Sequence, residues 1–366
     1  MLIPSYEIPS LPPPVDLETP KILRALAVAH RHLAELKGRA MAIPNQGILI
    51  DTLALQEAKA SSEIENIVTT QDELFQASLF PDGPNSPSAK EVAYYRDALK
   101  CGFERMIDDK GLLTTNAIIE IFQVLKRTSE RFRPGPGTAL MNEKAGTLVY
   151  VPPQTHQEIQ SKMNALEAFI NDESLTELDP LIKMALIHHQ FESIHPFSDG
   201  NGRVGRILNV LYLVQTGLLN TPILYLSRYI TTHKADYYRL LQKVRDENAW
   251  EEWVIFMLKA VAATSRQTLQ LIEGIGLLMA DYKQRLRSDP NIKYSQDLLN
   301  NLFRHPYTRI EFVQNELGVT RQTASKYLDQ LGAAGFLEKH HQGRNNYYVN
   351  VPLVALLMRV SDEDVL

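Results

Sequence analysis

Cysteine is almost absent from this chain, which has a single one, Cys101, among its 366 residues. One cysteine cannot form an internal disulfide, and this excludes the small disulfide-stapled scaffolds of secreted proteins. The most apolar stretch, 207–226, is interrupted by four polar or glycine residues. It therefore falls short of the roughly 18 apolar residues that a membrane span needs. The first residues also lack the basic and apolar regions of a signal peptide. We therefore expect a cytoplasmic protein with no membrane partner.

An excess of charge of one sign is also missing. Lysine and arginine number 38 against 43 acidic residues, which gives a net charge of -5. This balance argues against a chain built wholly to coat nucleic acid or an anionic membrane. The hydrophobic fraction of 44% is ordinary for a globular protein, and at roughly 150 residues per domain the length predicts two or three folded units.

The periodicity predicts a mainly α protein. Six prolines in residues 1–20 favour an extended arm, and helical spacing begins at Lys21. The β-branched and aromatic cluster at 147–151 predicts one short hairpin. We expect three regions: an N-terminal helical region 1–110, a helical core 111–287 and a C-terminal unit 288–366. Helices are predicted over 21–43, 47–64, 89–106, 115–127, from 156, over 181–194, 202–217 and, as one long stretch, 236–287.

The sequence HPFSDGNGRVGR, residues 195–206, forms an abrupt polar loop between two predicted helices. Gly200 and Gly202 tolerate positive backbone torsions, so successive amides can converge on an anion at the start of the next helix. Arg203 and Arg206 lie one turn apart and can present two guanidiniums to adjacent phosphates.

Two other side chains of the loop add chemistry. Asp199 beside a polyphosphate suits Mg²⁺, which prefers one or two carboxylates plus phosphate oxygens. His195 at the loop mouth can accept a proton near neutral pH. The glycines at 200, 202 and 205 also spell GxGxxG, but a helix rather than a strand precedes them, which argues against a dinucleotide-binding fold.

Every defined position of this loop resembles the signature of the Fic family, HPFx(D/E)GNGRxxR. The resemblance implies an all-helical core and transfer of AMP from ATP to a Ser, Thr or Tyr hydroxyl of a target protein. It implies that His195 is the base and that Asp199 holds Mg²⁺. Tyr237 and Tyr238 fall where the family often places adenine contacts, although core aromatics explain them nearly as well. The implied ATP-binding residues of the loop are Gly200, Asn201, Gly202, Arg203, Val204, Gly205 and Arg206.

The hairpin near Lys144 to Pro153 resembles the flap of the family, which holds the target segment as an added strand. A plain surface hairpin is the alternative. Modification of the chain itself is a further expectation, on a hydroxyl that can reach the flap.

The segment SSEIEN places Ser61, Glu65 and Asn66 in the pattern (S/T)xxxE(G/N). This resembles the inhibitory motif of Fic proteins whose inhibitor precedes the catalytic domain. A glutamate at a helix end can pair bidentately with Arg206 and occupy the guanidinium that the γ phosphate needs. The resemblance implies an autoinhibited enzyme, and a solvated glutamate is the alternative.

The C-terminal stretch 295–350 is typical of three helices and a wing, a winged helix-turn-helix. Between 318 and 350 four basic residues stand against two acidic ones. Arg321 and Lys326 are of types that contact DNA from a recognition helix. Such units also form homodimers, so the sequence leaves DNA and a second copy open as partners.

Two other functions compete with AMP transfer. A DNA-binding transcription regulator with the core as nucleotide sensor would leave the base in the loop unexplained. A metal hydrolase built on His188, His189 and His195 is weaker, because adjacent residues point about 100° apart on a helix. We therefore predict a nucleotidyltransferase.

Overall fold

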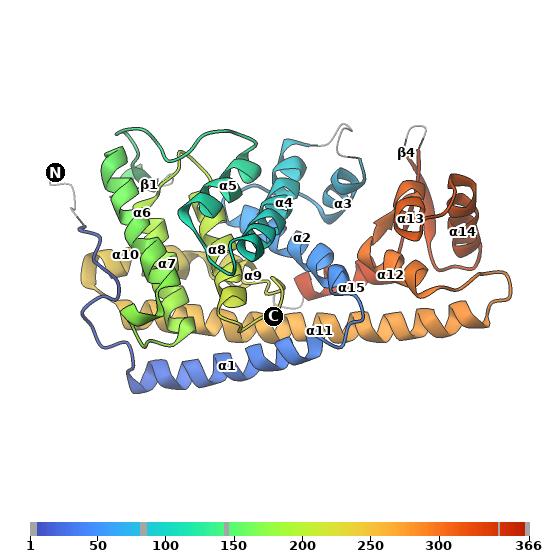
Figure 1. The fold of residues 1–366 in the computed structure, drawn as a ribbon, viewed down its shortest axis with the longest axis horizontal. Helices are drawn as coiled ribbons and strands as arrows, with labels where there is room; N and C mark the ends of the chain where they lie inside the picture. The colour runs from blue at the N-terminus through green and yellow to red at the C-terminus, as the bar shows by residue number, and fades with distance from the viewer. Residues whose placement is uncertain (1–5, 81–85, 143–145, 343–344, 363–366) are drawn as a thin grey trace. The chain divides into compact units, whose positions relative to one another are not determined.

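The computed structural model describes residues 6–80, 86–142, 146–342 and 345–362, and they form a mainly helical protein (Figure 1). The chain divides into two compact units. Unit 1 comprises Met1–Ala34, Glu57–Val68 and Tyr94–Ser265; unit 2 comprises Glu35–Gln56, Thr69–Ala93 and Arg266–Leu366. The three regions expected from the sequence, 1–110, 111–287 and 288–366, remain a prediction.

Four helices form the N-terminal part: α1 (Pro20–Ala40), α2 (Gln46–Ile64), α3 (Gln71–Leu79) and α4 (Pro87–Asp108). The sequence analysis missed α3, although a capping box marks its start. Thr70 accepts a hydrogen bond from the Glu73 amide, and the Glu73 carboxylate accepts one from the Thr70 amide. The nine residues of α3 are too few for a clear helical period.

Unit 1 is centred on α5 (Thr115–Lys126), α6 (His156–Asn171), α7 (Pro180–Ile194) and α8 (Asn201–Gln215), with the short η1 (Glu173–Leu175) between α6 and α7. The Thr114 side chain caps α5, and Asp179 caps α7, which begins at Pro180. Residues 181–194 of α7 are all buried. Helix α7 packs between α6 and α8 (Figure 1), so the loop at its end is fixed on both sides.

The predicted single helix over 236–287 is wrong. The structure has α9 (Ser227–Thr232), α10 (Lys234–Glu247) and α11 (Trp250–Ser288). Asn248 ends α10 in the left-handed conformation with φ 58°, which asparagine tolerates better than most residues. The buried Trp250 then begins α11.

The predicted hairpin is present as β1 (Leu140–Asn142) paired antiparallel with β2 (Thr147–Tyr150). The strand ends at Tyr150, opposite Leu140, one residue earlier than predicted. Lys144, at the start of the predicted flap, lies outside the described residues.

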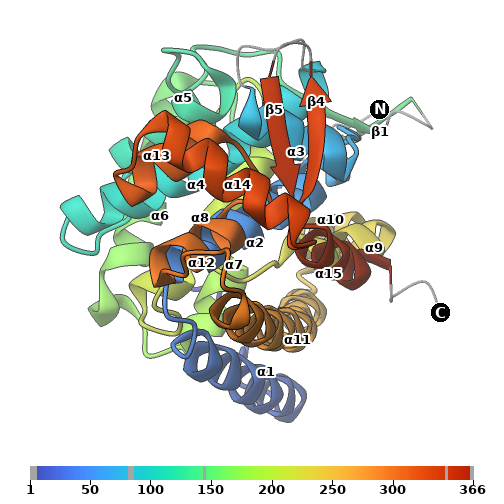
Figure 2. The same ribbon diagram turned by 90° about the vertical axis from the view of Figure 1, so that its right-hand side faces the viewer.

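The C-terminal part of unit 2 contains three helices followed by a hairpin. A three-stranded antiparallel sheet has the order β3-β5-β4, with β4 and β5 as its long strands (Figure 2). The winged helix-turn-helix assignment remains a prediction. The elements are α12 (Gln296–Arg304), β3 (Tyr307–Thr308), α13 (Ile310–Leu317), α14 (Arg321–Ala333), β4 (Glu338–Gln342), β5 (Asn345–Val349) and α15 (Val351–Asp362).

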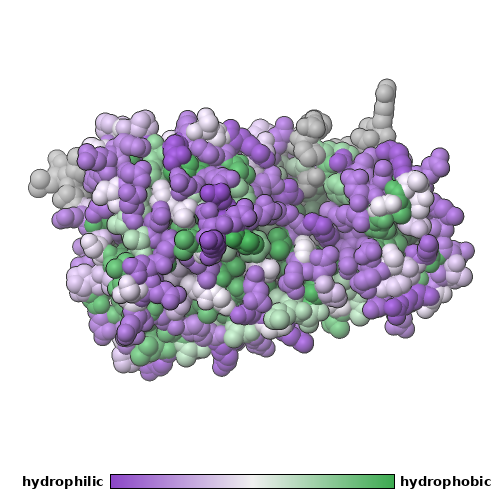
Figure 3. All heavy atoms as spheres, viewed as in Figure 1, coloured by the Kyte–Doolittle hydropathy of each residue, from purple (hydrophilic) through white to green (hydrophobic). Residues whose placement is uncertain are grey.

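Hydrophilic side chains dominate the face shown in Figure 3, with hydrophobic ones scattered between them. Within the described ranges, no helix combines the length and the apolar character that crossing a membrane requires.

Candidate active site

The loop 195–206 joins the end of α7 to the start of α8 through two left-handed residues. His195 ends α7 with φ 51°, and Gly200 precedes α8 with φ 78°. Gly200 offers no side-chain cap to the first amides of α8. Uncapped amides at a helix start attract anions because they carry the positive end of the helix dipole.

The loop is held to its surroundings by aromatic and amide contacts. Phe197 is buried and stacks on Phe122 of α5, with ring centroids 4.0 Å apart. The Asn201 side chain accepts a hydrogen bond from the Phe197 amide (2.8 Å) and donates one to the Phe197 carbonyl (2.9 Å). Asn201, predicted to bind phosphate, thus uses its side chain to brace the loop.

Asp199 is exposed beside the start of α8. Its carboxylate accepts hydrogen bonds from Lys126 Nζ and from the Gly200 amide, both at 2.6 Å. Partial burial raises the pKa of Asp199, but the Lys126 hydrogen bond and the charges of Lys126 and Arg203 outweigh it and hold that pKa below its ordinary value. The carboxylate is therefore ionised and can bind a cation.

Three further loop residues lie inside the fold. The Arg203 side chain is buried, and its guanidinium lies 3.8 Å from the Asp199 carboxylate. Val204 is buried. A Cβ on Gly205 would lie 2.7 Å from Glu192 Oε1, so this glycine allows α7 and α8 to pack closely rather than facing open space.

Arg206 is fully buried and is held by the end of α2. Its Nε donates to Ser61 Oγ, and its Nη2 donates to the Ser61 carbonyl and to Glu65 Oε1, each at 2.8 Å. Burial lowers the pKa of Arg206, but Glu65 and other nearby acidic groups raise it above its ordinary value. The predicted Glu65–Arg206 pair is present, yet it is not bidentate, because Ser61 takes the other contacts.

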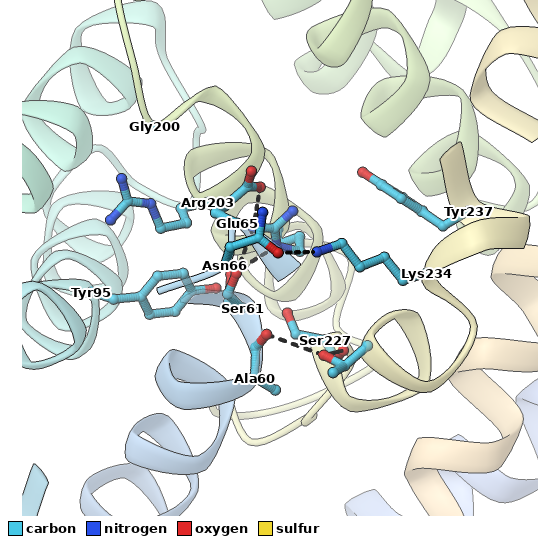
Figure 4. Close-up of polar contacts among 12 residues, drawn as sticks. Ala60, Ser61, Glu65, Asn66, Tyr95, Gly200, Arg203, Ser227, Lys234 and Tyr237 are labelled. Carbon is cyan, nitrogen blue, oxygen red and sulfur yellow. Dashed lines mark hydrogen bonds and ion pairs between the residues drawn. The ribbon is translucent and has the colours of Figure 1, made fainter. Parts of the chain in front are cut away.

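Asn66 extends the contacts of this segment. It adopts φ 61° directly after Glu65, and its Oδ1 accepts a hydrogen bond from Lys234 Nζ at 2.9 Å (Figure 4). Glu65 itself lies over α8: a Cβ on Gly202 would come within 2.4 Å of its Oε1. The Glu65 carboxylate thus occupies the space beside the first turn of α8.

A buried carboxylate on α2 supports the same helix end. Glu57 accepts hydrogen bonds from the Ser227 amide (2.9 Å), the Ser227 hydroxyl and the Tyr95 hydroxyl (3.2 Å). Burial raises the pKa of Glu57 to about 6. The sequence analysis missed these three residues, which are distant from each other along the chain and form no local pattern.

His195 is half-buried and its backbone is fixed by Arg133. Arg133 Nε donates to the His195 carbonyl, and the Arg133 amide donates to the Pro196 carbonyl, both at 2.9 Å. Burial, followed by the charges of Arg133 and Arg245, lowers the pKa of His195 to about 4. The imidazole is therefore neutral at physiological pH and can accept a proton.

A cavity of about 770 Å³ opens over these residues, large enough for a nucleotide-sized ligand. Its wall combines the polar groups of the loop with apolar side chains of the hairpin and of α10. Glu192 is also in this wall; burial raises the pKa of its carboxyl to about 7. The lining includes Glu65, Leu140, His195, Arg206, Tyr238 and Arg245.

The two predicted adenine contacts differ in their surroundings. Tyr237 is buried, and its hydroxyl lies 2.9 Å from His188 Nε2. Tyr238 is 44% exposed, and both tyrosines line the cavity. His188 and His189 are buried, and both rings pack against Trp253. In the part of the chain that the structure describes, no group of three His, Cys, Asp or Glu residues could hold a metal ion.

Three family models match the chain, one after another along the sequence. Residues 23–104 match the Fic/DOC family N-terminal region, residues 112–213 the Fic/DOC family, and residues 278–353 the C-terminal domain of SoFic-like protein adenylyltransferases. Together these matches span more than half of the chain. The protein belongs to the Fic/DOC family.

Relatives of known name are similar over parts of this Fic protein. A protein adenylyltransferase Fic from Aedes aegypti is 25% identical over 54% of this chain and 37% of its own length. A probable protein adenylyltransferase from Aquifex aeolicus is 50% identical over 15% of this chain and 17% of its own. The chain thus spans well under two thirds of the length of these relatives.

Solved structures show the same fold. A Fic family protein from Desulfovibrio desulfuricans aligns with a TM-score of 0.56 and 22% identity, over 92% of this chain and 98% of that one. A Fic domain containing signaling protein from Bacteroides thetaiotaomicron aligns with a TM-score of 0.51 and 19% identity, over 69% and 95%.

Proposed function

We propose that this Fic protein is a protein adenylyltransferase, which transfers AMP from ATP to a hydroxyl of a target protein. The observation that carries the proposal is the convergence, on one cavity, of an uncapped helix start, a buried arginine and a neutral histidine. Relatives named as protein adenylyltransferases share this family, which supports the nucleotidyl transfer over the regulator alternative.

Each group in the cavity has a chemical task in this reaction. His195 takes the proton of the target hydroxyl, whose oxygen bonds to the α phosphorus while the bond to the bridging oxygen breaks and pyrophosphate leaves. The uncapped amides of α8 and the guanidiniums of Arg203 and Arg206 offset the phosphate charge. Tyr238 and the apolar side chains of the hairpin would cover the adenine ring of ATP.

Asp199 is the residue that would hold Mg²⁺. Its carboxylate is ionised, exposed and next to the proposed phosphate site, which fits a cation that binds one carboxylate together with phosphate oxygens. When bound there, Mg²⁺ would neutralise phosphate charge. Lys126, which holds Asp199 in the structure, would then have to give up its hydrogen bond.

Glu65 is proposed to inhibit the reaction. Its carboxylate holds Arg206 and fills the space beside Gly202, so the γ phosphate would meet both a blocked guanidinium and a negative charge. Ser61 fixes Arg206 toward α2, and the Asn66–Lys234 hydrogen bond fixes the segment after the helix. Removing the Glu65 side chain would leave the rest of this arrangement in place.

The flap and the C-terminal unit carry the remaining proposals about partners. The hairpin β1–β2 borders the cavity, which supports docking of a target segment, including one of the chain itself. The structure adds no support for DNA binding through 318–350, because Arg321 pairs with Glu311 and Lys339 with Asp329. Arg344 lies outside the described residues. The structure also adds no support for a homodimer.

The decisive experiment uses ATP labelled on the α phosphate, with Mg²⁺ and cell lysate as acceptor. We expect little labelled protein with the wild type and a large increase with Glu65→Gly. Adding His195→Ala to Glu65→Gly should lower the label by about 100-fold or more, because a positioned base contributes that much. Glu63→Gly is the matched control, since Glu63 is exposed on the same helix end. Absence of label in every variant would contradict the proposal.

A further inference from the structure

The N-terminal arm, residues 6–17, is packed onto the helices of unit 1, to which it belongs, although it forms no helix or strand itself. Ile8 and Leu17 are buried, with exposed fractions of 5% and 3%. Lys162 Nζ donates to the Ile8 carbonyl at 2.7 Å, and Gln190 Nε2 donates to the Pro9 carbonyl at 2.8 Å. Since prolines lack an N–H, the carbonyls are the groups of this arm that most need partners, and α6 and α7 supply them.

Tyr6 contacts two aromatic residues close to the candidate active site. Its ring meets Tyr150 edge-on at a centroid distance of 6.0 Å and His189 at 6.2 Å. The Tyr6 hydroxyl is buried and has no hydrogen-bond partner among the described residues. The ring rather than the hydroxyl therefore makes the contact.

Tyr150 joins the hairpin to the helix that carries the base. It is the last residue of β2 and is 2% exposed. Its hydroxyl donates to the Ser193 carbonyl at 2.9 Å, and the Arg245 guanidinium lies 4.2 Å from its ring centroid. Ser193 stands two residues before His195, so Tyr150 connects the flap strand to the last turn of α7.

A second connection runs parallel to this one. Arg133 donates through Nη2 to the Pro153 carbonyl, three residues after the flap strand, and through Nε to the His195 carbonyl. The end of the hairpin and the backbone of His195 are thus held at two points. Tyr6 packs edge-on against the Tyr150 ring, so its removal would leave a gap beside that ring.

We propose that the arm is a positioning strap: Tyr6, packed on Tyr150, holds the end of the flap strand against the last turn of α7. Tyr6 and Tyr150 are positioning residues, because they act through the flap and through the backbone before His195. The consequence for target docking rests on the proposed AMP transfer. The strap itself can be measured without ATP or a target.

The first test is amide hydrogen exchange in the full chain. Tyr6→Ala should speed amide exchange of residues 147–151 by about three- to tenfold, the effect of losing one aromatic pair. Tyr6→Phe should leave it unchanged, because this variant keeps the ring and loses only a hydroxyl without a partner. Unchanged exchange in Tyr6→Ala would overturn the proposal. An equal increase in 204–213 of α8 would also overturn it, since the arm would then stabilise unit 1 as a whole.

Tyr150→Phe tests the other half of the connection. This variant keeps the ring contact with Tyr6 but removes the hydrogen bond to the Ser193 carbonyl. Exchange should rise in both 147–151 and 190–195, the two segments that the bond joins. A rise confined to 147–151 would show that α7 does not depend on the strap, which contradicts the proposed connection.

The last test links the strap to docking. In Glu65→Gly, adding Tyr6→Ala should lower labelling of lysate proteins from α-labelled ATP by about three- to tenfold, and adding Tyr6→Phe should not. Unchanged labelling together with faster flap exchange would overturn the role in docking. If Glu65→Gly itself transfers no label, the proposed function fails, and the exchange experiment still decides whether the strap exists.

Discussion

The starts of α8 and α14 both carry arginines, Arg203 and Arg206 in the first two turns of α8 and Arg321 in the first turn of α14. The two helix starts differ in what they leave open to a ligand. Helix α8 follows Gly200, which provides no side-chain cap, whereas Thr320 caps α14 through its hydroxyl. The Arg206 side chain of α8 is buried, whereas the Arg321 side chain of α14 is 66% exposed and pairs with Glu311. A helix start thus becomes a candidate anion site when its amides are uncapped and its cations are buried toward a cavity.

The largest expected difference concerns the two arginines. Arg206→Ala would strand the Glu65 carboxylate and two acceptors of Ser61, and we expect it to lower the free energy of unfolding by about 3 kcal/mol. Arg321→Ala removes an exposed pair and should cost less than about 1 kcal/mol. Denaturant unfolding measures both, and equal losses would contradict the distinction between the two helix starts.

The glycines near the two helix starts, Gly205 and Gly318, should also differ in how much stability their substitution costs. A Cβ on Gly205 would lie 2.7 Å from Glu192 Oε1 and 3.1 Å from the Phe191 ring, so Gly205→Ala should cost about 2 kcal/mol through overpacking. Gly318, before α14, has open space but φ +63°, and Gly318→Ala should cost about 1 kcal/mol from the left-handed backbone. Thermal unfolding would rank the two variants, and the reverse order would show that α7 and α8 can separate without cost.

The smallest effect is expected from acid. Because the pKa of His195 is lowered to about 4, the imidazole stays neutral down to pH 5, whereas an unperturbed histidine would be protonated below about 6.5. We expect kcat/KM of Glu65→Gly to show no fall due to His195 between pH 8 and pH 5. A fall centred near 6.5 would contradict this. A change in kcat/KM centred near pH 7 that disappears in Glu192→Gln would belong to Glu192, because burial raises the pKa of its carboxyl to about 7.

The loop and its partner segment could be predicted because each is a short contiguous pattern. Residues 195–206 carry the glycines, the arginines and the histidine in the loop after α7 and at the start of α8. The pairing of Glu65 with Arg206 was predictable from the resemblance of 61–66 to an inhibitory motif, although not the share of the guanidinium that Ser61 takes. Local sequence patterns thus identified the central contacts of the site.

The groups that support the site could not be predicted in the same way. Arg133, Arg245 and Glu57 reach it from three separate segments, and their roles depend on tertiary packing rather than on local spacing. Likewise, no periodicity shows that the Asn201 side chain bonds to the loop backbone. The break at Asn248 was not predicted because a single left-handed residue separates α10 from α11, and the spacing of apolar residues continues across it.

In the proposed mechanism, Glu65 occupies the Arg206 guanidinium that would otherwise bind the γ phosphate. Calorimetric titration of ATP and ADP into the wild type, Glu65→Gly and Glu63→Gly tests this role directly. We expect the wild type and Glu63→Gly to bind both nucleotides about equally. Glu65→Gly should bind ATP about 10- to 100-fold more tightly than ADP, the value of one or two charge-assisted hydrogen bonds. The same preference for ATP in the wild type would contradict the account, because Arg206 would then be available despite Glu65.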